Sequence, residues 1–108
     1  MKDNNKKKKV ALIGCGLIGQ SWAISFLSAG FSVSLFDPTE GVTEAAKEKI
    51  TAKLHDLQNH GLISKRKISD YFSQIYLAPS ISKAVQDSVY VQESGPENLS
   101  IKKSLHAI

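Results

Sequence analysis

Apolar residues in the first third of this chain fall into short runs that alternate with a longer amphipathic stretch. Residues 10–13 are all aliphatic, which is typical of a strand that is buried on both faces of a parallel sheet. Residues 17–29 carry apolar side chains at helical spacing, and Gly30 follows at a position that favours glycine beyond a helix. Residues 31–36 alternate as F-S-V-S-L-F, so we expect this second strand to be less buried than the first.

The remainder of the chain continues the alternation of helical and extended patterns. An apolar helical stripe runs through residues 41–59 and ends before Gly61, whereas residues 62–73 are polar and irregular and predict a loop. The other predicted elements are a strand at 74–78, a helix at 82–86, a strand at 88–92 and a last helix that begins near Pro96. This order predicts an α/β fold, a doubly wound parallel sheet of the Rossmann type with spatial order 3-2-1-4, which stops after about four strands.

A glycine-rich turn joins the first predicted strand to the first predicted helix. Gly14, Gly16 and Gly19 have the G-x-G-x-x-G spacing. The first glycine permits a tight turn, the second leaves room for a pyrophosphate, and the third allows the helix to pack closely on the sheet. The helix also directs free backbone N–H groups and its positive dipole end toward the phosphates. This arrangement predicts a dinucleotide-binding βαβ unit.

An acidic residue at the end of the second strand indicates which dinucleotide is bound. Asp37 can accept hydrogen bonds from the 2′- and 3′-hydroxyls of a ribose, and its charge would repel a 2′-phosphate. We therefore expect the cofactor to be NAD rather than NADP.

The N-terminal residues suggest one alternative, a signal peptide. Lys6–Lys9, the apolar run after them and the small residues 28–30 imitate the layout of such a peptide. Three glycines would interrupt its apolar helix, however, and a signal peptide leaves Asp37 unexplained. We instead expect residues 1–9 to form a disordered basic arm and residues 10–108 to form an incomplete NAD-binding domain.

Charge and composition narrow the classes of protein that remain. The arm holds five lysines and one aspartate, which accounts for the net charge of +4 of the whole chain. No aromatic interleaving or basic helix face supports nucleic-acid binding, and no apolar run reaches the ~20 residues of a membrane span. The single cysteine, Cys15, excludes an internal disulfide and is expected to be inert packing. We expect a cytoplasmic protein without a metal site. The helical spacing of Trp22 predicts that its side chain lies in the core.

A second polar pattern follows the last predicted strand. The segment YVQESGPENLSIKK places Glu97 and Lys102 at the start of the last predicted helix. From spacing alone, Glu97 complements the helix dipole and Lys102 is an exposed lysine.

This segment, together with GCGLIGQSWAISFLSAGFSVSLFDP, resembles the N-terminal part of the 3-hydroxyacyl-CoA dehydrogenase family. Within the family it is similar to the branch that holds λ-crystallin (L-gulonate 3-dehydrogenase) and L-carnitine dehydrogenase. The resemblance implies that the backbone at Leu17 and Ile18 meets the pyrophosphate and that Asp37 meets the adenosine ribose. It also implies that Glu97 and Lys102 lie at the nicotinamide side.

The same resemblance implies an oxidoreductase that transfers hydride from a C3 hydroxyl to NAD. Its substrate would be a 3-hydroxy acid or an acyl-CoA, and the full-length enzyme would be a homodimer. The family's histidine lies in an H-P-x-N-like motif, which His55, His60 and His106 do not match, so we assign no catalytic residue. We expect this chain alone to be inactive. The alternatives are a module that binds NAD without turnover and a crystallin-like structural protein.

Overall fold

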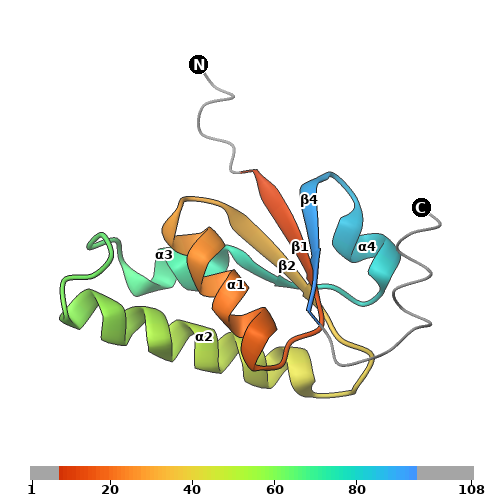
Figure 1. Ribbon diagram of the computed structural model, residues 1–108, viewed down its shortest axis with the longest axis horizontal. Coiled ribbons are helices and arrows are strands. Elements are labelled where there is room, and N and C mark those ends of the chain that lie inside the picture. Colours follow the sequence, from red (N-terminus) through yellow and green to blue (C-terminus); the bar gives the residue numbers. More distant parts are fainter. Residues whose placement is uncertain (1–7, 95–108) are drawn as a thin grey trace.

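Four parallel strands form a sheet with helices on both faces in the computed structural model, which describes residues 8–94 (Figure 1). The strands are β1 (Lys9–Ile13), β2 (Ser32–Phe36), β3 (Ile75–Leu77) and β4 (Ser88–Glu93). Their spatial order is β3-β2-β1-β4, and all three neighbouring pairs are parallel. The predicted order 3-2-1-4 is confirmed. The predicted last helix lies outside the described residues.

The helices divide between the two faces of this sheet. They are α1 (Leu17–Ser28), α2 (Val42–Asn59), α3 (Ile68–Ser73) and α4 (Ile81–Val85). Helices α1 and α2 pack side by side on one face, while α4 contacts β1, β2 and β4 from the other (Figure 1). Side chains alternate along a strand, so β1 and β2 each contribute residues to both layers.

The larger core lies between the sheet and the helices α1, α2 and α3. It combines alternate residues of β1 and β2 with one stripe from each long helix. Its buried members are Val10, Leu12, Cys15, Ala23, Leu27, Val33, Leu35, Ala46, Ile50, Leu54, Tyr71 and Ile75. The smaller core beneath α4 consists of Ala11, Ile13 and Ala84. Most of the buried apolar surface therefore lies on the side of α1 and α2.

The second strand is buried more completely than its alternating sequence predicted. Ser32 and Ser34 are 6% and 2% exposed, and four of the five residues of β2 are buried. The prediction of a less buried strand was wrong because β2 lies between β1 and β3 and is also contacted by α4. Serine is small enough to lie under a helix, so polarity did not indicate solvent exposure here.

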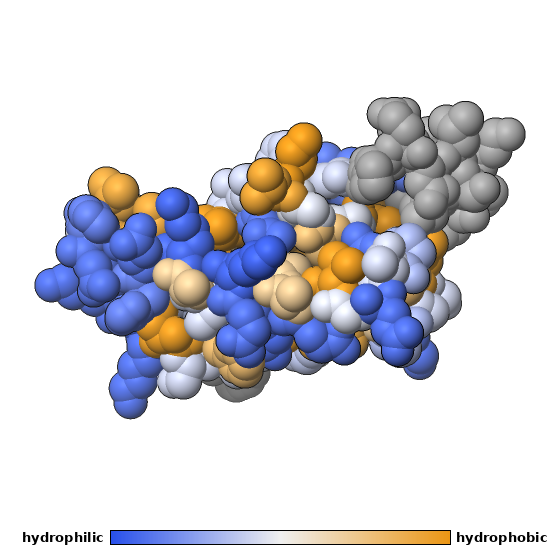
Figure 2. Space-filling model, turned by 90° about the horizontal axis from the view of Figure 1, so that it is seen from below, coloured by the Kyte–Doolittle hydropathy of each residue, from blue (hydrophilic) through white to orange (hydrophobic). Residues whose placement is uncertain are grey.

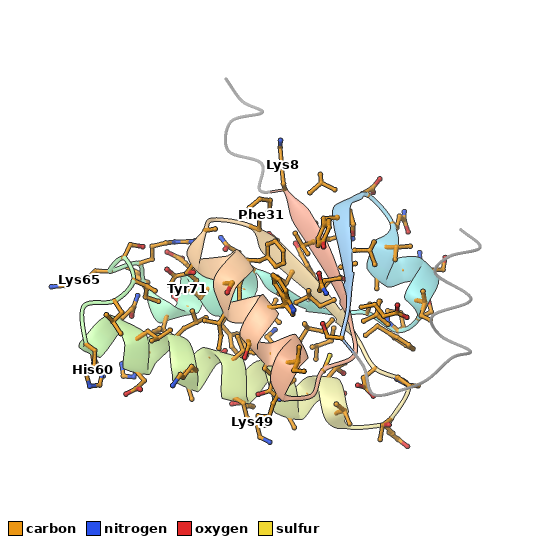
Figure 3. The ribbon with its side chains drawn as sticks, in the orientation of Figure 1. Lys8, Phe31, Lys49, His60, Lys65 and Tyr71 are labelled. Carbon is orange, nitrogen blue, oxygen red and sulfur yellow. The ribbon has the colours of Figure 1, made fainter. Side chains whose placement is uncertain are left out.

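The segment predicted to be an irregular loop at residues 62–73 contains the helix α3. Tyr71 on α3 is fully buried, Ile63 and Ile68 pack against the larger core, and the Arg66 guanidinium lies over the Tyr71 ring at 4.6 Å. Figure 3 labels Tyr71 inside the molecule, with His60 and Lys65 toward the far end of α2. The loop prediction was wrong because a helix of six residues is too short to show a periodic apolar pattern.

Trp22 lies on the surface of α1 rather than in the core as predicted. Its side chain is 40% exposed, and its ring stacks on Phe26 with centroids 5.9 Å apart. Phe26 also contacts the Tyr90 ring of β4 at 5.9 Å. The buried residues of α1 are Gly19, Ala23 and Leu27, and Trp22 lies about 100° around the helix from Ala23. Its helical spacing was compatible with burial, but the helix face that it occupies is not covered by the described residues.

The first strand begins one residue earlier than predicted. Strand β1 begins at Lys9, the last residue of the expected arm, and the carbonyl of Lys8 accepts a hydrogen bond from Ser32 N–H at 2.9 Å. Along the edge strand β4, the register shifts so that Lys9 pairs with Ser88 and Val10 pairs with Tyr90.

Seen from the side of α2, the surface is largely hydrophilic with scattered apolar patches (Figure 2). No helix among residues 8–94 is long and apolar enough to cross a membrane.

Candidate functional site

The glycine-rich turn connects the carboxyl end of β1 to the first residue of α1. Gly14 has φ +98°, a conformation that L side chains rarely adopt, and its N–H donates to the Phe36 carbonyl at 2.8 Å. The turn is thereby tied to the end of the neighbouring strand β2. This is the tight turn that the glycine motif predicted.

The other two glycines of the motif differ in whether a side chain would fit in their place. A Cβ atom built on Gly19 would lie 2.0 Å from the Gly14 carbonyl oxygen, so a larger residue does not fit without displacing backbone. A Cβ atom on Gly16 would meet nothing within 4 Å. The close approach at Gly19 is therefore between the helix and its own turn, whereas Gly16 borders open space at the start of the helix.

The first turn of α1 borders this open space. Gly16 is its N-cap with an extended backbone and no side-chain cap, and the first helical hydrogen bond runs from Gln20 N–H to the Gly16 carbonyl at 2.9 Å. The N–H groups at the start of a helix have no partner within it and favour a bound anion. Leu17 and Ile18 are 83% and 65% exposed, so the backbone there is not enclosed by other described residues. A pyrophosphate fits this cradle.

Asp37 connects the end of β2 to the glycine turn. Its Oδ2 atom accepts a hydrogen bond from Cys15 N–H, and its Oδ1 atom accepts one from Thr39 N–H, both at 2.9 Å. A carboxylate can accept about four hydrogen bonds, so capacity for hydroxyl donors remains. The sequence placed Asp37 correctly at the strand end, but it did not reveal that this side chain also holds the turn.

Cys15 lies in the middle of this hydrogen-bonded turn. It is 2% exposed, and its Sγ contacts the Phe36 carbonyl at 3.6 Å. Burial, and secondarily the negative charge of Asp37, raises the pKa of the thiol from 9.0 to about 12. The thiol is therefore protonated and unreactive at neutral pH, in agreement with the expectation of inert packing.

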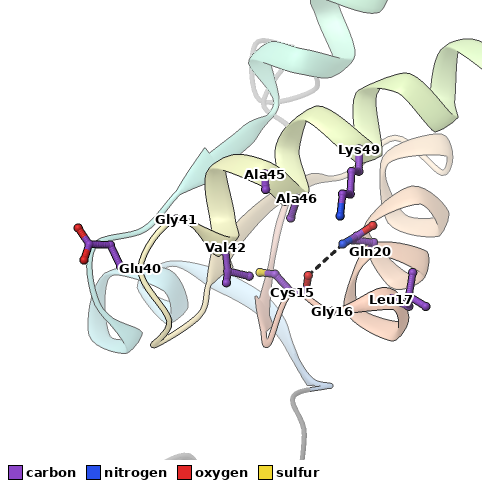
Figure 4. Close-up of a pocket in the computed structure, with 10 residues that line it drawn as sticks. All are labelled: Cys15, Gly16, Leu17, Gln20, Glu40, Gly41, Val42, Ala45, Ala46 and Lys49. Carbon is purple, nitrogen blue, oxygen red and sulfur yellow. Dashed lines mark hydrogen bonds between the residues drawn. The ribbon is translucent and has the colours of Figure 1, made fainter.

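A pocket of about 510 Å³ lies beside the turn, between the beginnings of α1 and α2 (Figure 4). Its lining residues are Cys15, Gly16, Leu17, Gln20, Glu40, Gly41, Val42, Ala45, Ala46 and Lys49. Gln20 Nε2 donates to the Cys15 carbonyl at 3.1 Å, and Figure 4 shows the Lys49 and Gln20 side chains extending toward each other. Sequence analysis missed Gln20 and Lys49, because nothing in the spacing of two separate helices shows that they face one cavity.

The structure does not test the two predicted contacts on the nicotinamide side of the cofactor, and it describes two of the three histidines. Glu97 and Lys102 lie outside the described residues, as does His106. His55 is exposed on α2, and His60 is exposed at the C-terminal end of this helix, away from the glycine turn (Figure 3). Residues 8–94 contain no cluster of side chains suited to a metal ion.

The parallel sheet, the glycine turn and the acid at the end of β2 together define a dinucleotide-binding domain of the kind found in dehydrogenases. Residues 9–107 match the family model described as 3-hydroxyacyl-CoA dehydrogenase, NAD binding domain. The chain belongs to this family, which confirms the resemblance and the expectation that the cofactor is NAD.

Individual relatives agree with this assignment. The human lambda-crystallin homolog is 35% identical over 99 residues, which are 91% of this chain and 31% of the relative. The L-carnitine dehydrogenase of a Pseudomonas species is 31% identical over 100 residues, 93% of this chain and 30% of the relative. The structure of 3-hydroxybutyryl-CoA dehydrogenase from Escherichia coli K12 is similar with a TM-score of 0.76 and 26% identity, covering 93% of this chain and 21% of that one. The chain thus spans about a third of the length of these curated relatives.

Proposed function

We propose that this chain binds NAD across the carboxyl ends of β1 and β2 and supplies the cofactor-binding part of a 3-hydroxyacid dehydrogenase. The backbone of Gly14, Gly16 and Gly19 and the N–H groups at Leu17 and Ile18 would hold the pyrophosphate. The observation that carries this proposal is the Asp37 carboxylate, which bonds the glycine turn and retains capacity for ribose hydroxyls. Glu97 and Lys102 are proposed to contact the nicotinamide side.

NAD, when bound, accepts a hydride from the C3 hydroxyl carbon of the substrate. The residues of this chain contribute binding and orientation: the turn fixes the phosphates, and Asp37 fixes one ribose. A bound and oriented cofactor lowers the entropic cost of the reaction, but the proton on the hydroxyl still needs a base. We propose no base among the residues of this chain, and therefore no turnover by the chain alone.

Cofactor choice tests the proposal directly. We expect NAD to bind at least about tenfold more tightly than NADP, because Asp37 repels a 2′-phosphate at short range. Replacing Asp37→Ala should weaken NAD binding and narrow the difference between the two cofactors. Titrations monitored by fluorescence or calorimetry measure both effects, and Glu48→Ala, which removes an exposed carboxylate of α2 outside the pocket lining, is the matched control.

Equal affinity for NAD and NADP in the wild-type chain would contradict the role of Asp37. Failure to bind either cofactor would contradict the proposed function as a whole.

For the complete enzyme, we propose a small free 3-hydroxy acid, such as L-gulonate or L-carnitine, as the substrate in preference to a 3-hydroxyacyl-CoA. A CoA ester carries several phosphate charges that need cationic partners. Two cationic side chains on and after α2 already have partners within the fold. Lys47 Nζ donates to the Ile75 carbonyl at 2.9 Å and lies over the Phe72 ring, and Arg66 lies over the Tyr71 ring.

Steady-state rates on L-gulonate, L-carnitine and 3-hydroxybutyryl-CoA, measured on the complete enzyme, test this preference. A kcat/KM for the CoA ester more than about tenfold above both free acids would overturn it, since that ratio corresponds to about 1.4 kcal/mol in the opposite direction.

A further inference from the structure

Strand β3 lies at one edge of the sheet in the described part of the chain, so some of its backbone groups face away from β2. The parallel register pairs Leu35 of β2 with Leu77 of β3, and Ala78 N–H donates to the Leu35 carbonyl at 2.9 Å. A strand turns the backbone groups of successive residues in opposite directions, so those of Ile75 and Leu77 point to the outside of the sheet. Backbone groups in such a row form a template on which another strand can pair.

The side chains along this edge would not prevent such pairing. Tyr76 is 55% exposed and Leu77 is 37% exposed, and β3 itself carries no charged residue. A second copy of the chain would pair antiparallel about a two-fold axis at Tyr76, with Ile75 of each copy opposite Leu77 of the other. The Leu77 N–H of one copy would then donate to the Ile75 carbonyl of the other. Strand addition at this edge therefore depends on the Ile75 carbonyl.

This carbonyl already has a partner from α2. Lys47 Nζ donates to the Ile75 carbonyl at 2.9 Å and lies 4.1 Å from the centroid of the Phe72 ring on α3. The two contacts hold the ammonium group over the edge of β3, since a cation is attracted to the face of an aromatic ring. An approaching strand would have to displace this ammonium group, which would lose its acceptor beside apolar side chains. Lysine at a sheet edge opposes edge-to-edge association in this way.

We infer that Lys47 closes the β3 edge of the sheet to strand addition and so prevents copies of this chain from associating through it. The role is independent of the cofactor, because Lys47 is not among the residues that line the pocket beside the glycine turn. Lys53, an exposed lysine of the same helix, makes no hydrogen bond or ion pair through its side chain within residues 8–94. The two lysines therefore provide a matched comparison.

Sedimentation equilibrium of the 108-residue chain and its variants tests the inference. Lys47→Met keeps the unbranched stem of the side chain but cannot donate a hydrogen bond, and we expect it to lower the dissociation constant for self-association at least about tenfold. Lys47→Arg can still donate to the carbonyl and should behave like the wild type. Lys53→Met is the control for the lost charge. Any association through the other edge strand, β4, is common to all four proteins and cancels in this comparison.

The place of association is tested by hydrogen exchange and by a second substitution. Protection of the Leu77 amide should rise with protein concentration in Lys47→Met, because this N–H is bonded only in the associated form. Adding Leu77→Pro removes the outward N–H and no hydrogen bond to β2, so it should return the dissociation constant to the wild-type value. If this double variant fails to fold by circular dichroism, Tyr76→Lys, which opposes two like charges at the two-fold axis, takes the place of Leu77→Pro.

A Lys47→Met chain that associates no more strongly than Lys53→Met would overturn the inference. Association that leaves the Leu77 amide unprotected, or that persists in the double variant, would also overturn it, because the copies would then meet elsewhere on the molecule. None of these outcomes bears on NAD binding, which is measured separately by titration.

Discussion

Single residues of the glycine turn are constrained by backbone atoms rather than by side chains. Gly14 needs its positive φ, and Gly19 faces the Gly14 carbonyl oxygen at a distance that admits no Cβ. Gly16 faces open space, so the fold itself leaves room for a side chain there. The three glycines of one motif therefore have separable effects on stability and on binding.

This difference predicts opposite behaviour for two similar substitutions. Gly19→Ala should lower the free energy of unfolding by at least about 2 kcal/mol, because the turn or the helix has to move. Gly16→Ala should change stability by about 1 kcal/mol or less, the scale of an N-cap substitution, yet weaken NAD binding. Urea denaturation and NAD titration of both variants measure the two effects, and equal stability of the two variants would contradict the packing argument.

The buried thiol predicts a loss of stability in alkali. Burial raises the pKa of Cys15 to about 12 in the folded chain, against 9.0 for an ordinary thiol. A raised pKa means that the folded state holds its proton more tightly, so the stabilisation is complete below pH 9 and is lost as the pH rises toward 12. Between these values the wild-type chain should lose up to about 1.4 kcal/mol per pH unit relative to Cys15→Ala. Urea unfolding of both proteins at pH values on either side of 9 tests this, since their other titrating groups are shared.

The residues of the site were predictable from the sequence to different extents. The glycine spacing and the acid at the strand end are local patterns, so Gly14, Gly16, Gly19 and Asp37 could be named from the sequence. The hydrogen bond from Cys15 N–H to Asp37 joins residues 22 positions apart and depends on how two strand ends meet. Such a contact leaves no periodic signal.

At the scale of elements, each long helix is stabilised by the stripe that it buries. In α2 this stripe consists of Ala46, Ile50 and Leu54, which recur every four residues. Sequence periodicity predicted this helix well because it continues through five turns. The same reasoning failed for α3, which is too short for a period, and for the serines of β2, where burial is decided by neighbouring elements. Length and position in the sheet therefore limit what a one-dimensional pattern reveals.

A matched pair of leucines tests the role of the α2 stripe. Leu54 is fully buried, whereas Leu62, just beyond the same helix, is 69% exposed. Leu54→Ala should lower the free energy of unfolding by about 2–5 kcal/mol, because it leaves a cavity beneath α2. Leu62→Ala should change it by less than about 0.5 kcal/mol. Thermal and urea denaturation provide the comparison, and similar losses in both variants would show that the stripe is not the main attachment of α2.

For the whole molecule, residues 8–94 contain the candidate cofactor cradle, and we assign no catalytic residue among them. The relatives that it matches are about three times as long, and their additional length does not correspond to residues described here. We expect the purified 108-residue chain to form no NADH from L-gulonate, L-carnitine or 3-hydroxybutyryl-CoA, even at saturating NAD, because we assign no general base among residues 8–94. Absorbance assays with a protein-free blank measure this. Reproducible NAD-dependent turnover would show that the site has been misassigned.

The placement of β1 between β2 and β4 has a consequence for how the molecule is made. Lys9 pairs with Ser32, which follows soon along the chain, but also with Ser88, which lies close to the end of the described residues. A ribosome synthesises the chain from its N-terminus, so β1 can pair with β2 early. It can pair with β4 only when nearly all of the described chain has been synthesised. Closing such a long loop is slow compared with forming local contacts. We therefore expect nascent chains that end before Ser88 to expose one side of β1 and to depend most on chaperones at that stage of synthesis.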